Sequence, residues 1–179
     1  MSDDQNSTNL PSPPNAQGGR VSTGWQQLNL VLGFFSRIDT KLSVVLGIDL
    51  GMLALVATRL PPPSEMTAAA AVFTTLFFTA LGFSFRHLWN GSFPHLDGGT
   101  ASLLYFRSIA QMRESEFRQA CKSRSPEELA DDLFNQCWRN SKILTCKFHS
   151  LRQAYIATLL AVVPWVALII LLPSPQRPG

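Results

Sequence analysis

Three long apolar segments constrain the fold of this chain more than any other feature of its sequence. They cover Leu42–Thr58, Met66–Phe85 and Ala154–Leu172, and they are 17, 20 and 19 residues long. A helix of about 20 residues, within a range of about 17–25, crosses the hydrocarbon core of a bilayer. The second and third segments contain no Asp, Glu, Lys, Arg or His, and the first contains one, Asp49. The sequence therefore predicts an all-α integral membrane protein with three transmembrane helices.

The distribution of basic residues predicts how these segments are oriented. The 86–153 segment carries ten Lys and Arg, whereas the 59–65 loop carries only Arg59 and the residues after Leu172 carry only Arg177. By the positive-inside rule, residues 86–153 lie in the cytoplasm. Three crossings then place the N-terminus in the cytoplasm as well, and the 59–65 loop and the C-terminus outside.

Five parts follow one another along the chain. Residues 1–20 are polar and rich in Pro, Gly, Asn and Ser, which is typical of a disordered tail. Residues 21–85 are predicted to form an amphipathic helix followed by a transmembrane hairpin that turns at Pro61–Pro63. Residues 86–153 form a cytoplasmic helical module, 154–172 the third transmembrane helix, and 173–179 a short tail.

The sharpest local signal in this module is the start of a helix at Ser125. Ser125 is suited to the N-cap and Pro126 to the first helical position, and Glu128 completes a capping box. No Gly or Pro follows until Pro164, so one helix is predicted from 126 to about 172. A helix is also predicted to begin near Ser102 and to break near Ser115.

The sequence contains no recognisable catalytic or metal-binding motif. The histidines His87, His95 and His149 are scattered, and the spacing of the three cysteines matches no zinc site. We therefore expect no enzymatic activity, no metal and no cofactor.

Asp49 is the most unusual residue of the apolar segments. A carboxylate near the middle of a membrane costs about 2.5–3.5 kcal/mol on insertion scales, so its side chain should face other helices or water. In one interpretation Asp49 lines a pore or an ion path, or contacts another subunit. In the other it stays protonated and hydrogen-bonds to Thr74, Thr75 or Thr79.

Several charged residues near the membrane are candidates for binding a ligand. Asp39 and Lys41 flank the start of the first segment, either as anchors whose charges reach the membrane surface or as a cluster that senses a ligand. Further candidates for binding a phosphate are Arg107, Arg139, Lys142 and Lys147. The simpler interpretation of these four is a helix face exposed to water or to anionic headgroups.

Two stretches of the sequence resemble the Pycsar effector transmembrane family. The first is Phe35–Asp49, which resembles the start of that family's first transmembrane helix. The second comprises Ser102–Ile109, Glu116-Phe117, Leu129–Leu133, Asn140–Ile143 and Lys147–Leu151, whose order is similar to that of the family's cytoplasmic helices. The resemblance covers residues 35–172.

This resemblance implies a role in bacterial anti-phage defence. A partner cyclase makes cyclic CMP or cyclic UMP during infection, and the effector responds by impairing the inner membrane. The expected partners are the cyclic pyrimidine nucleotide as activating ligand, the lipid bilayer and further copies of the same chain, but no nucleic-acid polymer. The expected location is the bacterial inner membrane. Alternatives are a scaffolding membrane protein that docks a cytoplasmic partner, or a subunit of a small transporter with Asp49 as a proton site.

Overall fold

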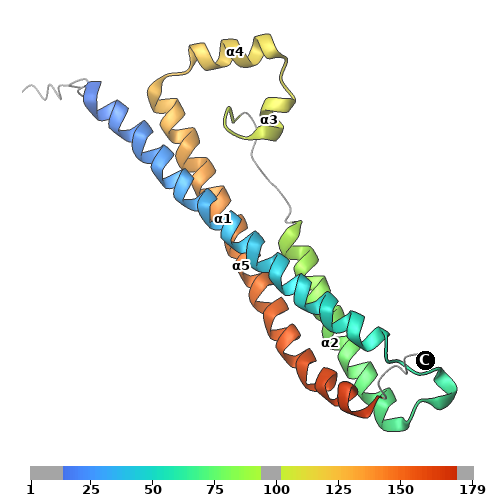
Figure 1. Ribbon diagram of the computed structural model, residues 1–179. Coiled ribbons are helices and arrows are strands. Elements are labelled where there is room, and N and C mark those ends of the chain that lie inside the picture. The colour runs from blue at the N-terminus through green and yellow to red at the C-terminus, as the bar shows by residue number, and fades with distance from the viewer. Residues whose placement is uncertain (1–13, 94–101, 173–179) are drawn as a thin grey trace, which may run out of the picture. The chain divides into compact units, whose positions relative to one another are not determined.

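The computed structural model describes residues 14–93 and 102–172, and every regular element within them is helical. The elements are α1 (Pro14–Ala57), the 3₁₀ helix η1 (Pro63–Glu65), α2 (Ala68–Ser92), α3 (Phe106–Ala110), α4 (Glu114–Ser123) and α5 (Pro126–Leu171) (Figure 1). The predicted all-α fold is confirmed for these residues. The first part of the N-terminal tail, residues 94–101 with His95, and the C-terminal tail lie outside the described residues.

Three of the helices, α1, α2 and α5, are long and apolar enough to cross a membrane. Two of the predicted transmembrane segments are parts of longer helices. α1 begins at Pro14, within the predicted tail, and runs without a break through the first apolar segment. α5 begins at Pro126, as the capping box predicts, and it continues through Pro164 to Leu171.

The chain divides into two compact units. Among the described residues, the first unit takes its members from Met1–Leu32 and Asp97–Ser141, and the second from Gly33–Leu96 and Lys142–Gly179. α1 and α5 therefore contribute residues to both units. The first part of α1 belongs to the same unit as the segment that contains α3 and α4.

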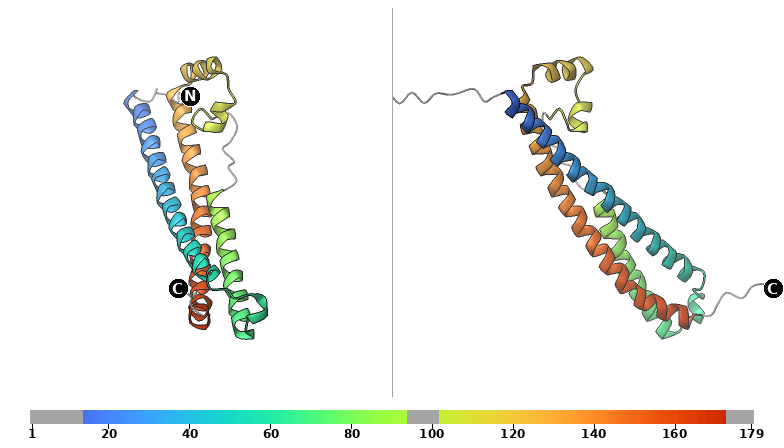
Figure 2. Two further views of the ribbon diagram at one scale, coloured as in Figure 1. Left: turned by 45° about the vertical axis from the view of Figure 1, so that its right-hand side comes forward. Right: turned by 60° about the vertical axis from the view of Figure 1, so that its left-hand side comes forward.

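In the second unit, α1, α2 and α5 lie side by side (Figure 2). Their facing sides form two clusters of buried apolar residues. One cluster includes Met52, Val56, Phe77, Leu81 and Leu168, and the other includes Ile38, Leu42, Val45, Leu88 and Leu151. The outward sides are apolar as well, with exposed side chains that include Val44, Val72, Val163 and Ile170. Apolar side chains on both the inner and the outer faces are what a helix needs when its surroundings are lipid.

The turn between α1 and α2 is built from prolines and a helix cap. Pro63 opens η1, and the Thr67 hydroxyl accepts a hydrogen bond from the backbone N–H of Ala70 at the start of α2. Arg59, just after α1, donates to the backbone carbonyl of Ile169 in the last turn of α5 at 3.1 Å. A cation at that position satisfies a carbonyl that the helix itself leaves unbonded.

In the first unit, α1 packs closely against α5. A Cβ atom at the buried Gly24 would lie 2.9 Å from Cβ of Leu133, so only glycine allows this approach. The predicted break near Ser115 occurs slightly earlier, between Ala110 and Glu114. Phe106, the first residue of α3, is largely exposed.

The capping box at the start of α5 provides a test of local stability. The Ser125 hydroxyl accepts from the N–H of Glu128 at 3.2 Å, and the Glu128 carboxylate accepts from the N–H of Ser125 at 2.8 Å. Replacing an N-cap serine by alanine costs about 1 kcal/mol. We expect Ser125→Ala to lower the hydrogen-exchange protection of the first turn of α5. Ser123→Ala is the control, because the exposed Ser123 hydroxyl bonds the carbonyl of Ala120 within its own helix.

The same cap should weaken in acid. The hydrogen bond from the Ser125 backbone holds the pKa of Glu128 below its ordinary value of 4.5. A lowered pKa means that the stabilisation is present above the ordinary value and is lost as the pH falls through the folded-state pKa. If the hydrogen-exchange protection of this turn changes neither in Ser125→Ala nor in acid, the cap does not stabilise the start of α5.

Candidate functional site

A layer of polar side chains lies inside the three-helix unit. Asp49 of α1, Ser84 of α2 and Thr158 of α5 are exposed by only 0%, 0% and 5%. Along each helix, the polar residue lies between members of the two apolar clusters, as Asp49 does between Val45 and Met52. Polar groups in such surroundings must satisfy one another, because an unpaired polar group is costly away from water.

The three side chains form a closed ring of contacts. Ser84 Oγ donates to Oδ2 of Asp49 at 2.5 Å, and Thr158 Oγ1 donates to Oδ1 of Asp49 at 2.8 Å. The two hydroxyl oxygens lie 3.1 Å apart, and either can be the donor of that contact. Each of the three helices therefore provides one member of the ring.

The ring has three contacts between oxygen atoms, but the two hydroxyl groups provide only two protons. Each hydroxyl has a single proton, so two hydroxyls that donate to a carboxylate leave none for the contact between them.

The partners of Asp49 differ from those that the sequence suggested. Thr75 and Thr79 are exposed and donate to the backbone carbonyls of Ala71 and Thr75. Thr74 Oγ1 is buried and has no hydrogen-bond partner among the described residues. Asp49 does face other helices, but its partners are the hydroxyl groups of Ser84, which lies nearer the C-terminal end of α2 than these threonines, and of Thr158 on α5.

A second polar contact joins α1 and α5 near the start of the first apolar segment. Lys147 Nζ lies 2.6 Å from Oδ1 of Asp39 and 5.7 Å from the centre of the Phe35 ring. The side chain of Lys147 is only 7% exposed, whereas that of Asp39 is 52% exposed. Asp39 was expected to act together with Lys41, but its ion-pair partner is Lys147. The Lys41 side chain is exposed and lines a groove between α1 and α5.

The five candidate cations are divided between the two units. Arg107 and Arg139 belong to the first unit, and Lys41, Lys142 and Lys147 belong to the second. Arg107 and Lys142 are exposed. Lys147 is engaged by Asp39, so its ammonium group is already neutralised by a carboxylate. Among the five, Arg139 is the one that lines a polar cavity.

This cavity, in the first unit, has a volume of about 300 Å³. Its lining is Ser102, Arg124, Glu128, Asp131, Asp132, Asn135, Gln136 and Arg139.

Most charges in the cavity already have partners. Arg124 pairs with Asp132 at 3.0 Å, and the capping box engages Glu128. Asp131 lies 3.8 Å from Arg20. Arg139 forms no ion pair with another described residue. It is therefore the group in this cavity best placed to receive an anion.

Within the described residues, no group of three His, Cys, Asp or Glu side chains is arranged to hold a metal ion. His87 on α2 is half-buried and His149 on α5 is exposed. The three cysteines are free thiols, and Cys121 and Cys146 are exposed.

Comparison with known protein families finds a match that covers most of the chain. The profile of the Pycsar effector protein domain (PycTM) matches residues 23–173. The chain belongs to the Pycsar effector family. This membership makes it an effector of anti-phage defence and confirms the resemblance found in the sequence. Neither the curated proteins nor the solved structures provide a match.

The matched region of this Pycsar effector contains the polar layer, the Asp39–Lys147 pair and the lining of the cavity. Sequence reasoning found Asp49 but missed Ser84 and Thr158. A signal for Thr158 was present, because it is the sole Ser or Thr of the third apolar segment. Ser84 was missed because it lies almost at the end of the second segment, whereas α2 continues to Ser92.

Proposed function

We propose that this Pycsar effector responds to cyclic CMP or cyclic UMP and then impairs the integrity of the bacterial inner membrane. The observation that supports this most is the polar layer between three helices whose outer faces are apolar. A carboxyl group at such a place is expensive in a bilayer and marks function by default. A rearrangement of the helices would separate Asp49 from its two hydroxyl partners and draw water or ions to it.

The proposed arrangement has α1, α2 and α5 crossing the membrane, with the N-terminus and α3–α4 in the cytoplasm, where the nucleotide is made. Apolar clusters pack on both sides of the polar layer within one chain. We therefore propose that the leak forms between several copies in a homo-oligomer. No step of this process requires bond chemistry, so the effector acts without being an enzyme and without a cofactor.

The proposed nucleotide site is the cavity that Arg139 lines. A charge-assisted hydrogen bond from Arg139 would hold the cyclic phosphate. The side-chain amides of Asn135 and Gln136 offer donors and acceptors for the edge of a pyrimidine. The volume of about 300 Å³ is at the lower end of the range of about 300–1,000 Å³ for small-molecule sites. Lys41, Arg107 and Lys142 remain weaker candidates, because none of them lines this cavity.

Arg139→Ala should weaken binding of the cyclic nucleotide by at least about tenfold, which corresponds to about 1.4 kcal/mol. The measurement is calorimetric titration of the purified full-length protein with cyclic CMP and with cyclic UMP. Arg118→Ala is the matched control, because Arg118 is exposed and pairs with Glu114 at 3.6 Å on α4. Equal affinity in wild type and Arg139→Ala would move the site elsewhere or make sensing indirect.

The function itself is tested by dye uptake. Cells that express the protein should admit a membrane-impermeant dye when a source of cyclic CMP or cyclic UMP is present, and should exclude it otherwise. A cyclase that makes cyclic purine nucleotides is the control for specificity. Exclusion of dye under every condition would contradict the proposal and favour a scaffolding protein. Nucleotide-independent proton transport would favour a transporter subunit.

A further inference from the structure

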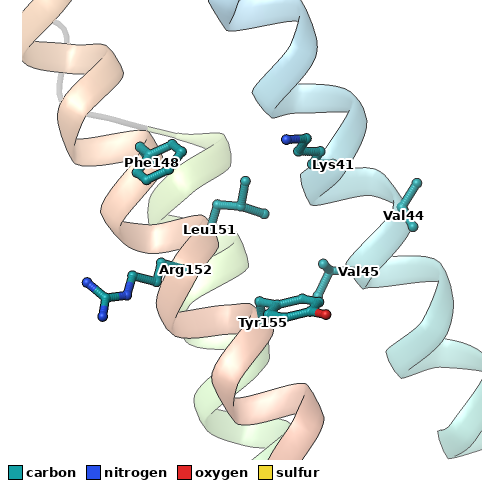
Figure 3. A pocket seen from close by; sticks show the side chains of 7 residues that line it. All are labelled: Lys41, Val44, Val45, Phe148, Leu151, Arg152 and Tyr155. Carbon is teal, nitrogen blue, oxygen red and sulfur yellow. The ribbon is translucent and has the colours of Figure 1, made fainter.

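Within the second unit, an open groove lies between α1 and α5 near Lys41. Its volume is about 700 Å³. Apolar side chains provide most of its lining, and they include Val44 and Val45 of α1 and Phe148 and Tyr155 of α5 (Figure 3). Val44, Phe148 and Tyr155 are exposed by 57%, 59% and 54%, so the described part of the chain leaves much of this apolar surface uncovered.

Two cations complete the lining of the groove, Lys41 and Arg152. In Figure 3 the Lys41 ammonium group points toward α5, while the guanidinium group of Arg152 extends on the side of α5 away from α1. Neither side chain forms an ion pair with another described residue. The nearby carboxylate of Asp39 is engaged by Lys147. The groove thus has positive charge without a counter-charge of its own.

The position of the two cations relative to the apolar segments indicates where the groove would lie relative to a membrane. Lys41 directly precedes the segment Leu42–Thr58, and Arg152 lies two residues before the segment Ala154–Leu172. From these cations the groove continues along Val44, Val45 and Tyr155 into the apolar part of both helices. In a membrane, the cations would lie at the headgroup level and the rest of the groove at the level of the acyl chains.

We propose that this groove binds an anionic phospholipid. Lys41, which points toward α5, would hold the headgroup phosphate, and the long side chain of Arg152 would turn from the outer side of α5 to join it. An acyl chain would lie along Val44, Val45 and Tyr155. Basic pockets between transmembrane helices are suited to acidic lipid headgroups. A cyclic nucleotide fits this groove poorly, because its ribose and base would find only the Tyr155 hydroxyl as an uncharged polar side-chain group. A bound lipid would bridge α1 and α5, two of the three helices that provide the polar layer.

This inference stands apart from the proposed function, because lipid binding requires neither a cyclic nucleotide nor a leak. The experiment uses the purified full-length protein in a neutral detergent, with phosphatidylglycerol or phosphatidylcholine added. Native mass spectrometry then measures how much of each lipid is bound. Wild type should bind phosphatidylglycerol preferentially. Each cation removed by Lys41→Gln or Arg152→Gln should weaken this binding by about fivefold.

The matched control is the double variant Arg37→Gln/Arg86→Gln. It removes the same charge from two exposed arginines that do not line the groove. This control should bind phosphatidylglycerol as wild type does. Circular dichroism should show that the control and the double variant Lys41→Gln/Arg152→Gln both keep their helices. Equal binding of the two lipids, equal loss in the control, or unchanged binding in Lys41→Gln/Arg152→Gln would each overturn the proposal. Displacement of the lipid by cyclic CMP, with the same variants losing the nucleotide, would assign the groove to the nucleotide instead.

Discussion

Replacing Asp49 by leucine should abolish nucleotide-dependent dye uptake while the protein remains inserted and helical. Asp49 is fully buried and is the group that links the hydroxyls of Ser84 and Thr158. Leucine extends the two apolar clusters through the layer. The hydroxyls lose the carboxyl group, but they can still bond to each other or to backbone carbonyls of their own helices. The folded state therefore survives, and the group that would draw water into a rearranged bundle is gone.

Asp49→Asn keeps the shape of the side chain and removes its ability to carry a charge. An amide can accept from Thr158 and donate to Ser84, so the ring of contacts is kept, but it cannot release a proton to become an anion. We expect normal expression and insertion, with dye uptake that falls well below that of wild type. Thr79→Leu is the matched control, because it also replaces a polar residue by leucine but on an exposed face of α2. Full activity of Asp49→Leu would show that the leak is built from other surfaces.

The helices were predictable from local rules. The capping box at Ser125 defines the start of α5, and the helix then continues through Pro164 to the end of the third apolar segment. The end of α1 follows from the prolines at 61–63. The start of α1 was not predictable in the same way, because residues 14–20 are polar and contain two glycines, and their helix is an extension of the apolar helix that follows.

The site was less predictable, because it depends on how helices are offset along one another. Asp49 stands out in any hydropathy pattern, but its partners depend on which level of α2 and α5 it meets. The pairing of Lys147 with Asp39 brings together residues 108 positions apart. Lys147 looked like one cation of an exposed cluster, and only the packing of α1 against α5 shows that it is buried.

Asp39→Asn should lower the free energy of unfolding by about 1–3 kcal/mol, because it leaves the ammonium group of Lys147 buried without its carboxylate. The two positions are not equivalent. Removing Lys147 leaves Asp39 half-exposed, where water or headgroups can replace the lost partner, so Lys147→Met should cost less than Asp39→Asn. The double variant Asp39→Asn/Lys147→Met should be more stable than Asp39→Asn alone, since no unpaired charge remains buried. Thermal unfolding of the purified protein in detergent measures all three.

The contrasting pair in the first unit provides the control for this prediction. Arg20 and Asp131 lie 3.8 Å apart, and their side chains are 58% and 69% exposed. Exposed pairs contribute about 0–1 kcal/mol, so Asp131→Asn should hardly change the unfolding temperature. If Asp39→Asn is as stable as Asp131→Asn, or if Lys147→Met fails to rescue it, the Asp39–Lys147 contact contributes little. If adding Lys147→Met restores the stability of Asp39→Asn, the destabilisation comes from the buried, unpaired ammonium group and not from the loss of a surface charge.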